Sequence, residues 1–211
     1  MTLLCRAAVH GCAVGLNVRR PGPPGAVTQP RAAPLAHLRA ASAAGGHDGS
    51  VDSRGDLAAR IVSALGERGQ TLATAESLTG GMLGAAITAI PGASAVYRGG
   101  VIAYATELKT ALLGVPADLL ARHGPVHPDV AWAMAAGVRD RLGATWGLAT
   151  TGVAGPDPVG GLPPGTVHIA TTAGQPATRA LALAGDRNDI RRDTVGEALK
   201  LLWGQLREDD P

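Results

Sequence analysis

The stretch TLATAESLTGGMLGAAITAI, residues 71–90, passes from a strand into a helix and decides the fold class. Residues 71–75 form a short apolar run, which is typical of a buried strand. From Thr79 the pattern favours a helix, which Pro91 and Gly92 end. A strand that leads directly into a helix is the repeating unit of layered α/β domains.

The rest of the chain continues this alternation. Asp56 can cap a helix that ends at Gly69. Further strands are expected at 100–104, 146–151, 166–172 and 178–183, and further helices at 106–113, 116–122, 128–142 and 188–206. Because a short hairpin-like link joins the last two strands, the sheet should be mixed. We therefore predict a single three-layer α/β/α domain with a mixed, mostly parallel sheet.

Residues 1–55 differ from the remainder in composition. They are rich in Ala, Gly, Pro and Arg and contain no aromatic residue, so they cannot build a packed core. We predict a poorly ordered extension over 1–55 and a folded domain over 56–208. The Arg-rich start could be a targeting peptide, but no n-region, h-region and cleavage site follow in order, which favours a simple extension.

The net charge of +2 is unevenly distributed. Residues 1–55 carry six Arg against two acids, whereas residues 56–211 carry thirteen Lys or Arg against fifteen acids. The domain has no basic stripe with interleaved aromatic residues, which argues against nucleic-acid binding. No apolar run is long enough to span a bilayer, so we expect no membrane contact. Both cysteines lie within residues 1–55, which fits a reducing, cytoplasmic setting. The sequence leaves the oligomeric state open, a homo-oligomer included.

The segment Ala75-Glu-Ser-Leu-Thr-Gly-Gly81 holds the first candidate site. A serine between a strand and a helix lies beside free backbone N–H groups and the positive end of the helix dipole, which stabilise an oxyanion or a phosphate. Ser77 or Thr79 could equally be a simple N-cap. The pair Gly80-Gly81 would weaken a helix, which favours a close approach to the backbone there.

Lys109 is the second candidate. Only two lysines occur in the chain, Lys109 and Lys200, against seventeen arginines. An amine can lose its proton and a guanidinium cannot, so a lysine here suggests a base for a serine nucleophile. The alternative is a solvated lysine paired with Glu107 or another acid.

Two further segments could bind an anion. Thr150-Thr151-Gly152 leaves a strand into a glycine-rich loop, where hydroxyls and exposed amides suit a phosphate or an oxyanion. It matches no known nucleotide-binding signature, so a generic loop is the alternative. Arginines in 185–192 could reach a phosphate from the first turn of the last helix, or could be surface charge only.

We expect no metal site. Both cysteines, Cys5 and Cys12, lie in the extension, so the domain has neither a disulfide framework nor a thiolate zinc site. His123 and His127 are four residues apart, but Gly124-Pro125 breaks the helix that a metal-binding pair at this spacing would need.

Seven segments, in order, resemble the CinA C-terminal domain family, which includes the stand-alone nicotinamide-nucleotide amidases. The resemblance covers about residues 56–206. Each segment alone is only weakly specific for the family, but seven segments in the family's order are specific. They are Thr74-Ala-Glu-Ser-Leu-Thr-Gly-Gly81, Gly99-Gly-Val-Ile-Ala-Tyr104 with Lys109, Leu112-Leu-Gly-Val-Pro116, Arg122-His-Gly124, Thr151-Gly-Val-Ala-Gly-Pro156, Pro164-Gly-Thr-Val167 and Gly185-Asp-Arg187.

The resemblance implies an amidase for nicotinamide mononucleotide that uses no metal or cofactor and yields nicotinic acid mononucleotide and ammonia, a step in pyridine-nucleotide recycling. It assigns Ser77 as the nucleophile and Lys109 as its base, with Tyr104 and Thr151 also in the catalytic site. Amides near Ser77 or Thr151 would bind the oxyanion. Contacts to the nucleotide are expected from Glu76, Thr79, Gly80, Gly81, Thr106, Gly152, Arg187 and Arg191, the two arginines at the phosphate.

The sequence departs from the family pattern near the expected nucleophile. The family often has Cys or a similar residue where Leu78 stands, Ser-Asn where Ala105-Thr106 stand, and Ser where His127 stands. An alternative is therefore a nucleotide-binding module of the same fold that has lost turnover. A third possibility is an amidase for another nucleotide or small amide. The longer family members carry an additional N-terminal pyrophosphatase domain, which we do not expect from residues 1–55.

Overall fold

The computed structural model of the protein describes residues 53–173 and 177–208. The predictions for the extension, up to residue 52, lie outside the described residues. The helices are α1 (Ser53–Glu67), α2 (Met82–Thr88), α3 (Thr106–Leu113), α4 (Ala117–His123), α5 (Pro128–Leu142) and α6 (Arg187–Glu208), with one short 3-10 turn, η1 (Ala93–Ala95). The strands are β1 (Leu72–Glu76), β2 (Tyr97–Ile102), β3 (Trp146–Gly152), β4 (Thr166–Thr172) and β5 (Ala177–Ala182).

The five strands form one sheet in the order β2-β1-β3-β4-β5. β1 lies at the centre of a parallel trio, because it pairs in parallel with both β2 and β3. β4 runs antiparallel to β3, and β5 runs antiparallel to β4. Four strands therefore share one direction and β4 opposes them, which confirms the predicted mixed, mostly parallel sheet.

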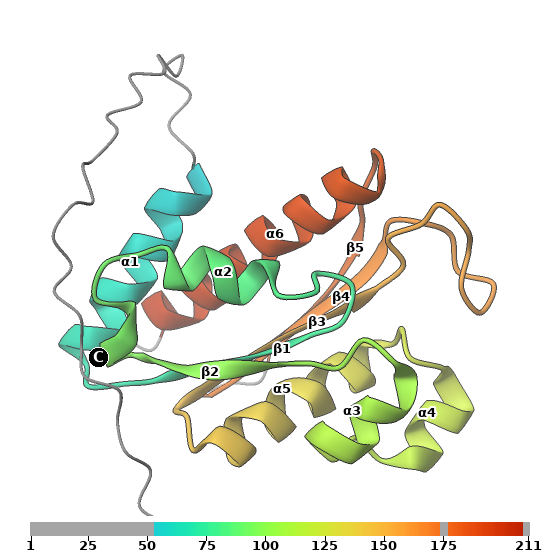
Figure 1. Ribbon diagram of the computed structural model, residues 1–211, viewed down its shortest axis with the longest axis horizontal. Coiled ribbons are helices and arrows are strands. Elements are labelled where there is room, and N and C mark those ends of the chain that lie inside the picture. Colours follow the sequence, from blue (N-terminus) through green and yellow to red (C-terminus); the bar gives the residue numbers. More distant parts are fainter. Residues whose placement is uncertain (1–52, 174–176, 209–211) are drawn as a thin grey trace, which may run out of the picture. The chain divides into compact units, whose positions relative to one another are not determined.

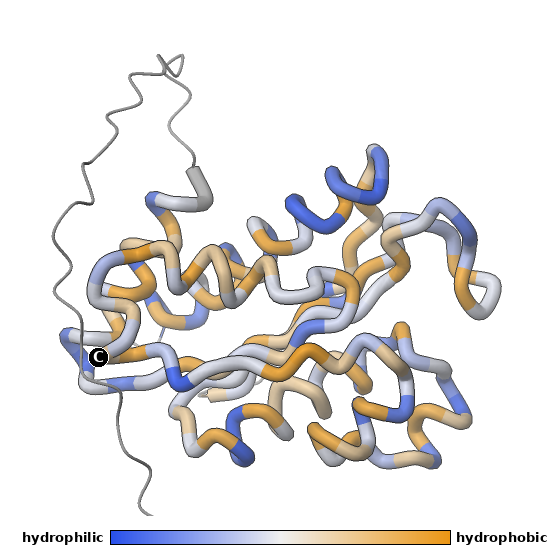
Figure 2. Tube along the Cα trace, in the orientation of Figure 1, coloured by the Kyte–Doolittle hydropathy of each residue, from blue (hydrophilic) through white to orange (hydrophobic). Residues whose placement is uncertain are grey.

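Helices cover both faces of the sheet (Figure 1). On one face α1, α2 and α6 enclose a core that includes Ile61, Leu83 and Leu199. On the other face α3, α4 and α5 enclose a second core, centred on Met134. All five residues of β1 are buried, because both of its faces are covered. Figure 2 shows hydrophilic residues concentrated at the first turns of α6, at the end of that helix layer.

α5 lies very close to β3 of the sheet and to the end of α3, and one glycine at each contact makes this possible. A Cβ atom on Gly147 of β3 would lie 2.0 Å from the backbone oxygen of Ala135 in α5. A Cβ on Gly137 of α5 would lie 1.8 Å from the backbone oxygen of Leu113. Since the atoms met are backbone rather than flexible side chain, only glycine fits at either place.

The element ends differ from the expected ones at two places near the site. α2 begins at Met82 and not at Thr79, because Gly80 and Gly81 have φ of 57° and 97° and so form a left-handed turn ahead of the helix. β2 ends at Ile102, two residues early, which leaves Tyr104 in the connection to α3. Both differences lengthen the loops at one edge of the sheet.

Candidate active site

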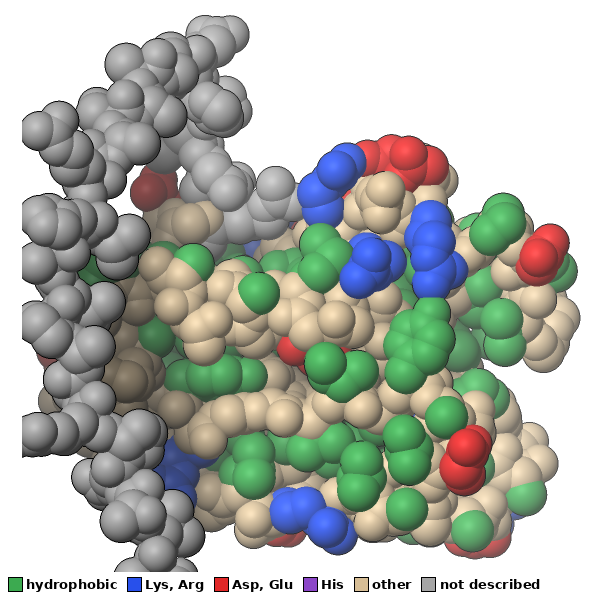
Figure 3. Space-filling view, in the orientation of Figure 1, with side chains coloured by type: hydrophobic (Ala, Val, Ile, Leu, Met, Phe, Trp, Pro, Cys, Tyr) green, Lys and Arg blue, Asp and Glu red, His purple; other side chains and the backbone are tan. Residues whose placement is uncertain are grey.

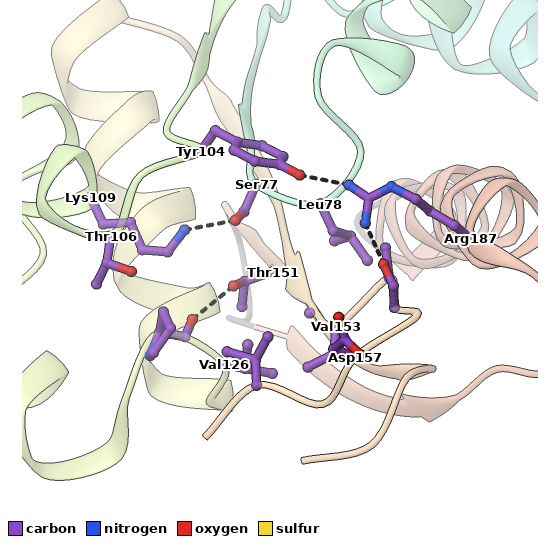
Figure 4. Close-up of a pocket in the computed structure, with 15 residues that line it drawn as sticks. Ser77, Leu78, Tyr104, Thr106, Lys109, Val126, Thr151, Val153, Asp157 and Arg187 are labelled. Carbon is purple, nitrogen blue, oxygen red and sulfur yellow. Dashed lines mark hydrogen bonds between the residues drawn. The ribbon is translucent and has the colours of Figure 1, made fainter. Parts of the chain in front are cut away.

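A pocket lies where the carboxyl ends of β1, β2 and β3 meet. The three strands are parallel, so the segments that follow them converge at one edge of the sheet, the usual place for a ligand in this class of fold. The pocket has an internal volume of about 200 Å³ and is open to solvent. The segments that follow the three strands, the turn after α4 and the start of α6 line it (Figure 4). The lining residues are Ser77, Leu78, Tyr104, Thr106, Lys109, Pro125, Val126, residues 151–155, Asp157, Val159 and Arg187.

Ser77 and Lys109 meet inside this pocket. Ser77 follows β1 directly, and its Oγ lies 2.8 Å from Nζ of Lys109, which reaches across from α3. The same amine donates a hydrogen bond to the backbone oxygen of Ala103 at 3.0 Å. The two residues are far apart in sequence, and the parallel pairing of β1 with β2 brings them together.

Lys109 is almost fully buried, with 1% of its surface exposed. Among the described residues no carboxylate lies within ion-pairing distance of its amine, so the alternative of a solvated pair with Glu107 is wrong. Burial without a countercharge disfavours the ammonium form and lowers the pKa of Lys109 from 10.5 to about 8. A substantial fraction of this amine is therefore neutral near physiological pH.

Some backbone N–H groups near Ser77 are free to bind an oxyanion and others are not. The N–H of Ser77 donates to the backbone oxygen of Thr150 at 3.0 Å, so it cannot bind an oxyanion. Within residues 53–173 and 177–208, the N–H groups of Leu78 and Thr79 donate no hydrogen bond. Of these two residues Leu78 lines the pocket. Of the amides near Ser77 that we expected to bind an oxyanion, the N–H of Leu78 is therefore the candidate.

Glu76 does not line the pocket, although we expected it to contact the substrate. Its side chain is buried and turns toward the start of α2, where Oε2 accepts from the N–H groups of Gly81 and Leu83 and Oε1 accepts from that of Gly84. A carboxylate at this end of a helix satisfies amides that would otherwise have no partner. Neither Ser77 nor Thr79 caps α2, so Glu76 takes the role that we considered for them.

Thr79 and Arg191 also hold the loop and do not reach the pocket. The hydroxyl of Thr79 is buried and lies 2.8 Å from that of Thr150. Arg191 of α6 donates to the backbone oxygens of Leu78 and Thr79, each at 2.9 Å. Gly80 and Gly81 shape the turn beside them and are absent from the pocket lining. Together these residues fix the segment that carries Ser77.

Thr151, Gly152 and Thr106 do line the pocket, as expected. The side chain of Thr151 is fully buried, and its hydroxyl donates to the backbone oxygen of Pro125 at 2.7 Å. That hydrogen bond ties the end of β3 to the turn between α4 and α5. Thr106 is the first residue of α3 and faces the pocket from the side of Lys109 (Figure 4).

Tyr104 and Arg187 form the outer edge of the pocket. The guanidinium group of Arg187 donates to the hydroxyl of Tyr104 at 2.6 Å and also to the backbone oxygen of Gly155. Both side chains are exposed, so a ligand in the pocket could reach them. Figure 3 shows basic side chains gathered over the first turns of α6, the segment that carries Arg187 and Arg192. The edge of the pocket therefore offers the guanidinium group of Arg187, with the carboxylate of Asp157 also in the lining.

Sequence reasoning missed the apolar part of the lining. Leu78, Val126, Val153 and Ala154 line the pocket together with Pro125. They lie in or beside the segments that carry the family resemblance, but apolar residues in loops give no chemical signal of their own. Asp157 and Val159, also in the lining, come from the glycine-rich loop whose path could not be predicted.

His123 and His127 lie beside each other, although Gly124 and Pro125 interrupt the helix between them as expected. Their rings stack with centroids 4.1 Å apart. His123 ends α4 and His127 caps α5, and the intervening turn at Gly124 and Pro125 folds one ring over the other. His123, His127 and Asp129 each offer one possible ligand atom, and these three atoms lie within 4.8 Å of one another.

None of the helices in the described part of the chain has the length and apolar character needed to cross a bilayer.

Comparison with known proteins points to a single family. The family model of the CinA C-terminal domain matches residues 54–206. A CinA-like protein of Frankia casuarinae is 50% identical over 169 residues, and one of Gemmatimonas aurantiaca is 54% identical over 152 residues. These matches cover 80% and 70% of this chain but only 38% and 35% of the two relatives. The chain thus spans less than two fifths of the length of these curated relatives.

Solved structures of the same superfamily share the fold. A CinA superfamily protein from Klebsiella pneumoniae 700603 has a TM-score of 0.71 and 35% identity, covering 74% of this chain and 98% of that one. One from Enterobacter cloacae has a TM-score of 0.72 and 32% identity, covering 76% and 96%. The resemblance inferred from the seven segments is confirmed, as is the α/β fold class.

Proposed function

This chain belongs to the CinA C-terminal domain family, and we propose on that basis that it is an amidohydrolase that converts nicotinamide mononucleotide to nicotinic acid mononucleotide and ammonia. The observation that carries the proposal is the contact of Ser77 Oγ with the amine of Lys109, 2.8 Å away inside a pocket. A hydroxyl next to a partly neutral, buried amine is an activated nucleophile. We place the reaction in cytoplasmic recycling of pyridine nucleotides.

In the first half of the reaction the neutral amine of Lys109 accepts the proton of Ser77 as Oγ attacks the carboxamide carbon. The carbonyl oxygen becomes an oxyanion, which the free N–H of Leu78 can stabilise. Lys109 then gives its proton to the leaving nitrogen, and ammonia departs. An ester joins Ser77 to the pyridine ring, and the amine is neutral again.

In the second half Lys109 accepts a proton from water, and the resulting hydroxide attacks the ester carbon. The bond to Oγ breaks and Ser77 regains the proton held by Lys109. The product forms as a carboxylic acid, which loses its proton to solvent or to the released ammonia and leaves as a carboxylate. The atoms balance, since one water is consumed for each ammonia released. The protons that leave and return to Ser77 all pass through one amine, so these transfers need no further acid or base.

The pocket walls suit the two ends of the substrate. Leu78, Val126 and Val153 offer apolar surface for a flat pyridine ring near Ser77. Arg187 and Tyr104 at the outer edge offer N–H and O–H donors for a phosphate. Arg187 already donates to a neutral hydroxyl and a backbone oxygen, and a phosphate is a stronger acceptor than either. Arg191 is less suited, because its guanidinium group donates to the backbone oxygens of Leu78 and Thr79.

The decisive test is ammonia release from nicotinamide mononucleotide by the purified chain, with the Ser77→Ala variant as control. We expect release from wild type only. Nicotinamide and nicotinamide riboside serve as matched substrates that lack the phosphate, and both should react with much lower kcat/KM. Release from a different carboxamide at a higher kcat/KM would identify another amidase substrate, and the mononucleotide would then be the wrong assignment.

A nucleotide-binding module without turnover is the second candidate. It is favoured by Leu78, an apolar side chain next to Ser77 in the pocket, where the family often has Cys or a similar residue. Such a module would bind nicotinamide mononucleotide by calorimetry but release no ammonia above the Ser77→Ala background. Binding and release measured on the same sample therefore separate the two candidates.

A further inference from the structure

The turn between α4 and α5 brings together side chains that the proposed reaction does not use. We propose that His123, His127 and Asp129 bind a divalent transition-metal ion of the zinc type. The imidazole rings of the two histidines stack with centroids 4.1 Å apart and an angle of 21° between their planes. Asp129 lies in the first turn of α5, two residues after His127.

The distances between the ligand atoms suit a single ion. One atom from each residue lies within 4.8 Å of the other two. Nδ1 of His127 lies 3.6 Å from Oδ2 of Asp129, and we assign this nitrogen as a ligand. Two donors on one tetrahedral zinc, each about 2.1 Å from it, are about 3.4 Å apart. The stacked rings direct their in-plane nitrogen lone pairs along nearly parallel planes, so His123 has to turn out of the stack for both imidazoles to bind one ion. His123 and Asp129 are exposed, which leaves their side chains room for this movement.

The types of ligand select the class of ion. Two imidazoles and one carboxylate favour Zn²⁺, Co²⁺ or Ni²⁺ over Mg²⁺ and Ca²⁺, which prefer oxygen ligands throughout. Three protein ligands leave at least one coordination position for water. Nδ1 of His127 accepts only a long hydrogen bond, 3.3 Å, from the N–H of Asp129, so a metal can replace it at small loss.

The turn that carries the ligands is already held in place. Gly124 adopts a φ of 72°, which lets the chain reverse between the two rings. The hydroxyl of Thr151 donates to the backbone oxygen of Pro125 at 2.7 Å and so fastens the turn to β3. Because the backbone between His123 and His127 is fixed, little ordering is needed when an ion binds.

The site adjoins the proposed active site without belonging to it. Pro125 and Val126 lie between the two histidines and line the pocket of Ser77. A bound ion would restrain this wall, but no step of the proposed reaction passes through the ion. The proposal of a metal site is therefore independent of the proposed amidase activity, and its test measures metal binding and not activity.

The test is a calorimetric titration of the full-length chain with Zn²⁺ and with Co²⁺, comparing wild type with His127→Ser and Asp129→Asn. Asp118→Asn is the matched control, since Asp118 is an exposed acid in the first turn of the neighbouring helix α4. We expect one ion whose affinity falls by about tenfold or more in the first two variants and is unchanged in the control. Unfolding temperatures without metal show whether each variant is folded.

The N-terminal extension must be separated from this site, since it contains His10, His37 and His47 as well as both cysteines. Ions bound there persist in His127→Ser and Asp129→Asn, and cysteine ligation adds a thiolate-to-cobalt charge-transfer band to the Co²⁺ spectrum. The site at the turn should instead show a visible Co²⁺ spectrum without that band, lost in both variants. Equal stoichiometry and affinity in wild type and the two variants would overturn the proposal, as would no binding at all.

Discussion

Nζ of Lys109 lies 2.8 Å from Oγ of Ser77, although the amine belongs to a helix and the hydroxyl to the loop after the central strand. The contact depends on the sheet, because β1 and β2 run in parallel and end at the same edge. The amine is buried and has no carboxylate partner among the described residues. A stable fold thus holds a lysine in an environment that favours its neutral form.

Replacing Ser77 by Ala should abolish ammonia release while the fold persists. Oγ is half-buried and its side-chain hydrogen bond is to Lys109, so its removal leaves no packing gap of consequence. We expect kcat to fall roughly 10³-fold or more, the range seen when a nucleophile is deleted. Circular dichroism and unfolding temperature check that the variant is folded. Residual turnover within tenfold of wild type would rule out Ser77 as the nucleophile.

Lys109→Arg should lose activity even though the positive charge is kept, because a guanidinium does not give up its proton and cannot act as a base. The measurement is kcat on nicotinamide mononucleotide. Lys200→Arg is the matched control, since Lys200 is exposed and pairs with Glu197 on α6. Near-normal kcat in Lys109→Arg would remove the amine from the mechanism.

The pH profile should follow the pKa of Lys109, which burial lowers to about 8. The neutral amine is the active form, so kcat/KM should fall about tenfold per pH unit below pH 8 and level off above it. A profile that is flat between pH 6 and 9 would contradict this assignment.

The lowered pKa of Lys109 should also make the free energy of unfolding depend on pH. In the unfolded chain Lys109 keeps its ordinary pKa of 10.5. Between about pH 8 and 10.5 the unfolded state therefore holds a proton that the native state has lost, so the free energy of unfolding rises with pH in this window. Lys109→Met removes this contribution. Denaturant titrations of both proteins at several pH values measure the difference in slope.

Arg187→Gln should raise KM for nicotinamide mononucleotide by about tenfold to a hundredfold with a smaller change in kcat, because the guanidinium lies at the pocket edge and away from Ser77. Nicotinamide riboside, which has no phosphate, should show no such change. Arg192→Gln is the control, since that side chain pairs with Asp189 and does not line the pocket. Equal effects on both substrates would mean that Arg187 supports the fold and not the phosphate.

Glu76→Gln should lower the free energy of unfolding by about 1–3 kcal/mol, because a buried carboxylate that accepts three backbone N–H groups is replaced by a group with one acceptor oxygen. Urea denaturation measures the change. Glu107→Gln is the comparison, since Glu107 is exposed in the first turn of α3 and should change stability by less than about 0.5 kcal/mol. Similar losses in both variants would contradict the capping role.

Much of the fold could be predicted because local patterns and tertiary structure agree. The helices at 106–113 and 128–142 and the strand at 166–172 have the predicted ends, since Pro, Gly and the spacing of apolar residues mark their limits. The sequence also pointed to Ser77 and Lys109, whose chemistry is unusual for their surroundings. Their contact at 2.8 Å depends on the tertiary structure, and only the family resemblance pointed to it before the structure was known.

The parts that could not be predicted depend on where side chains turn in three dimensions. Glu76 is next to Ser77 in the chain, yet it points to the opposite side and caps α2, because successive side chains of a strand alternate. His123 and His127 were dismissed by a rule that holds for one helix, whereas a turn stacks their rings. In both cases the backbone path, and not residue type, decided the outcome.

The close packing of α5 against β3 and against α3 has a consequence for protein engineering. A Cβ atom on Gly147 or Gly137 would meet the backbone oxygen of Ala135 or Leu113, which cannot move without shifting a whole helix. A library intended to change substrate range should leave these two codons untouched. At Leu78, Val126 and Val153 it should make only apolar exchanges of similar size, because these side chains line the pocket and are also buried in the protein. Variation is thus restricted to apolar exchange at these three lining positions and to a single amino acid at the two glycines.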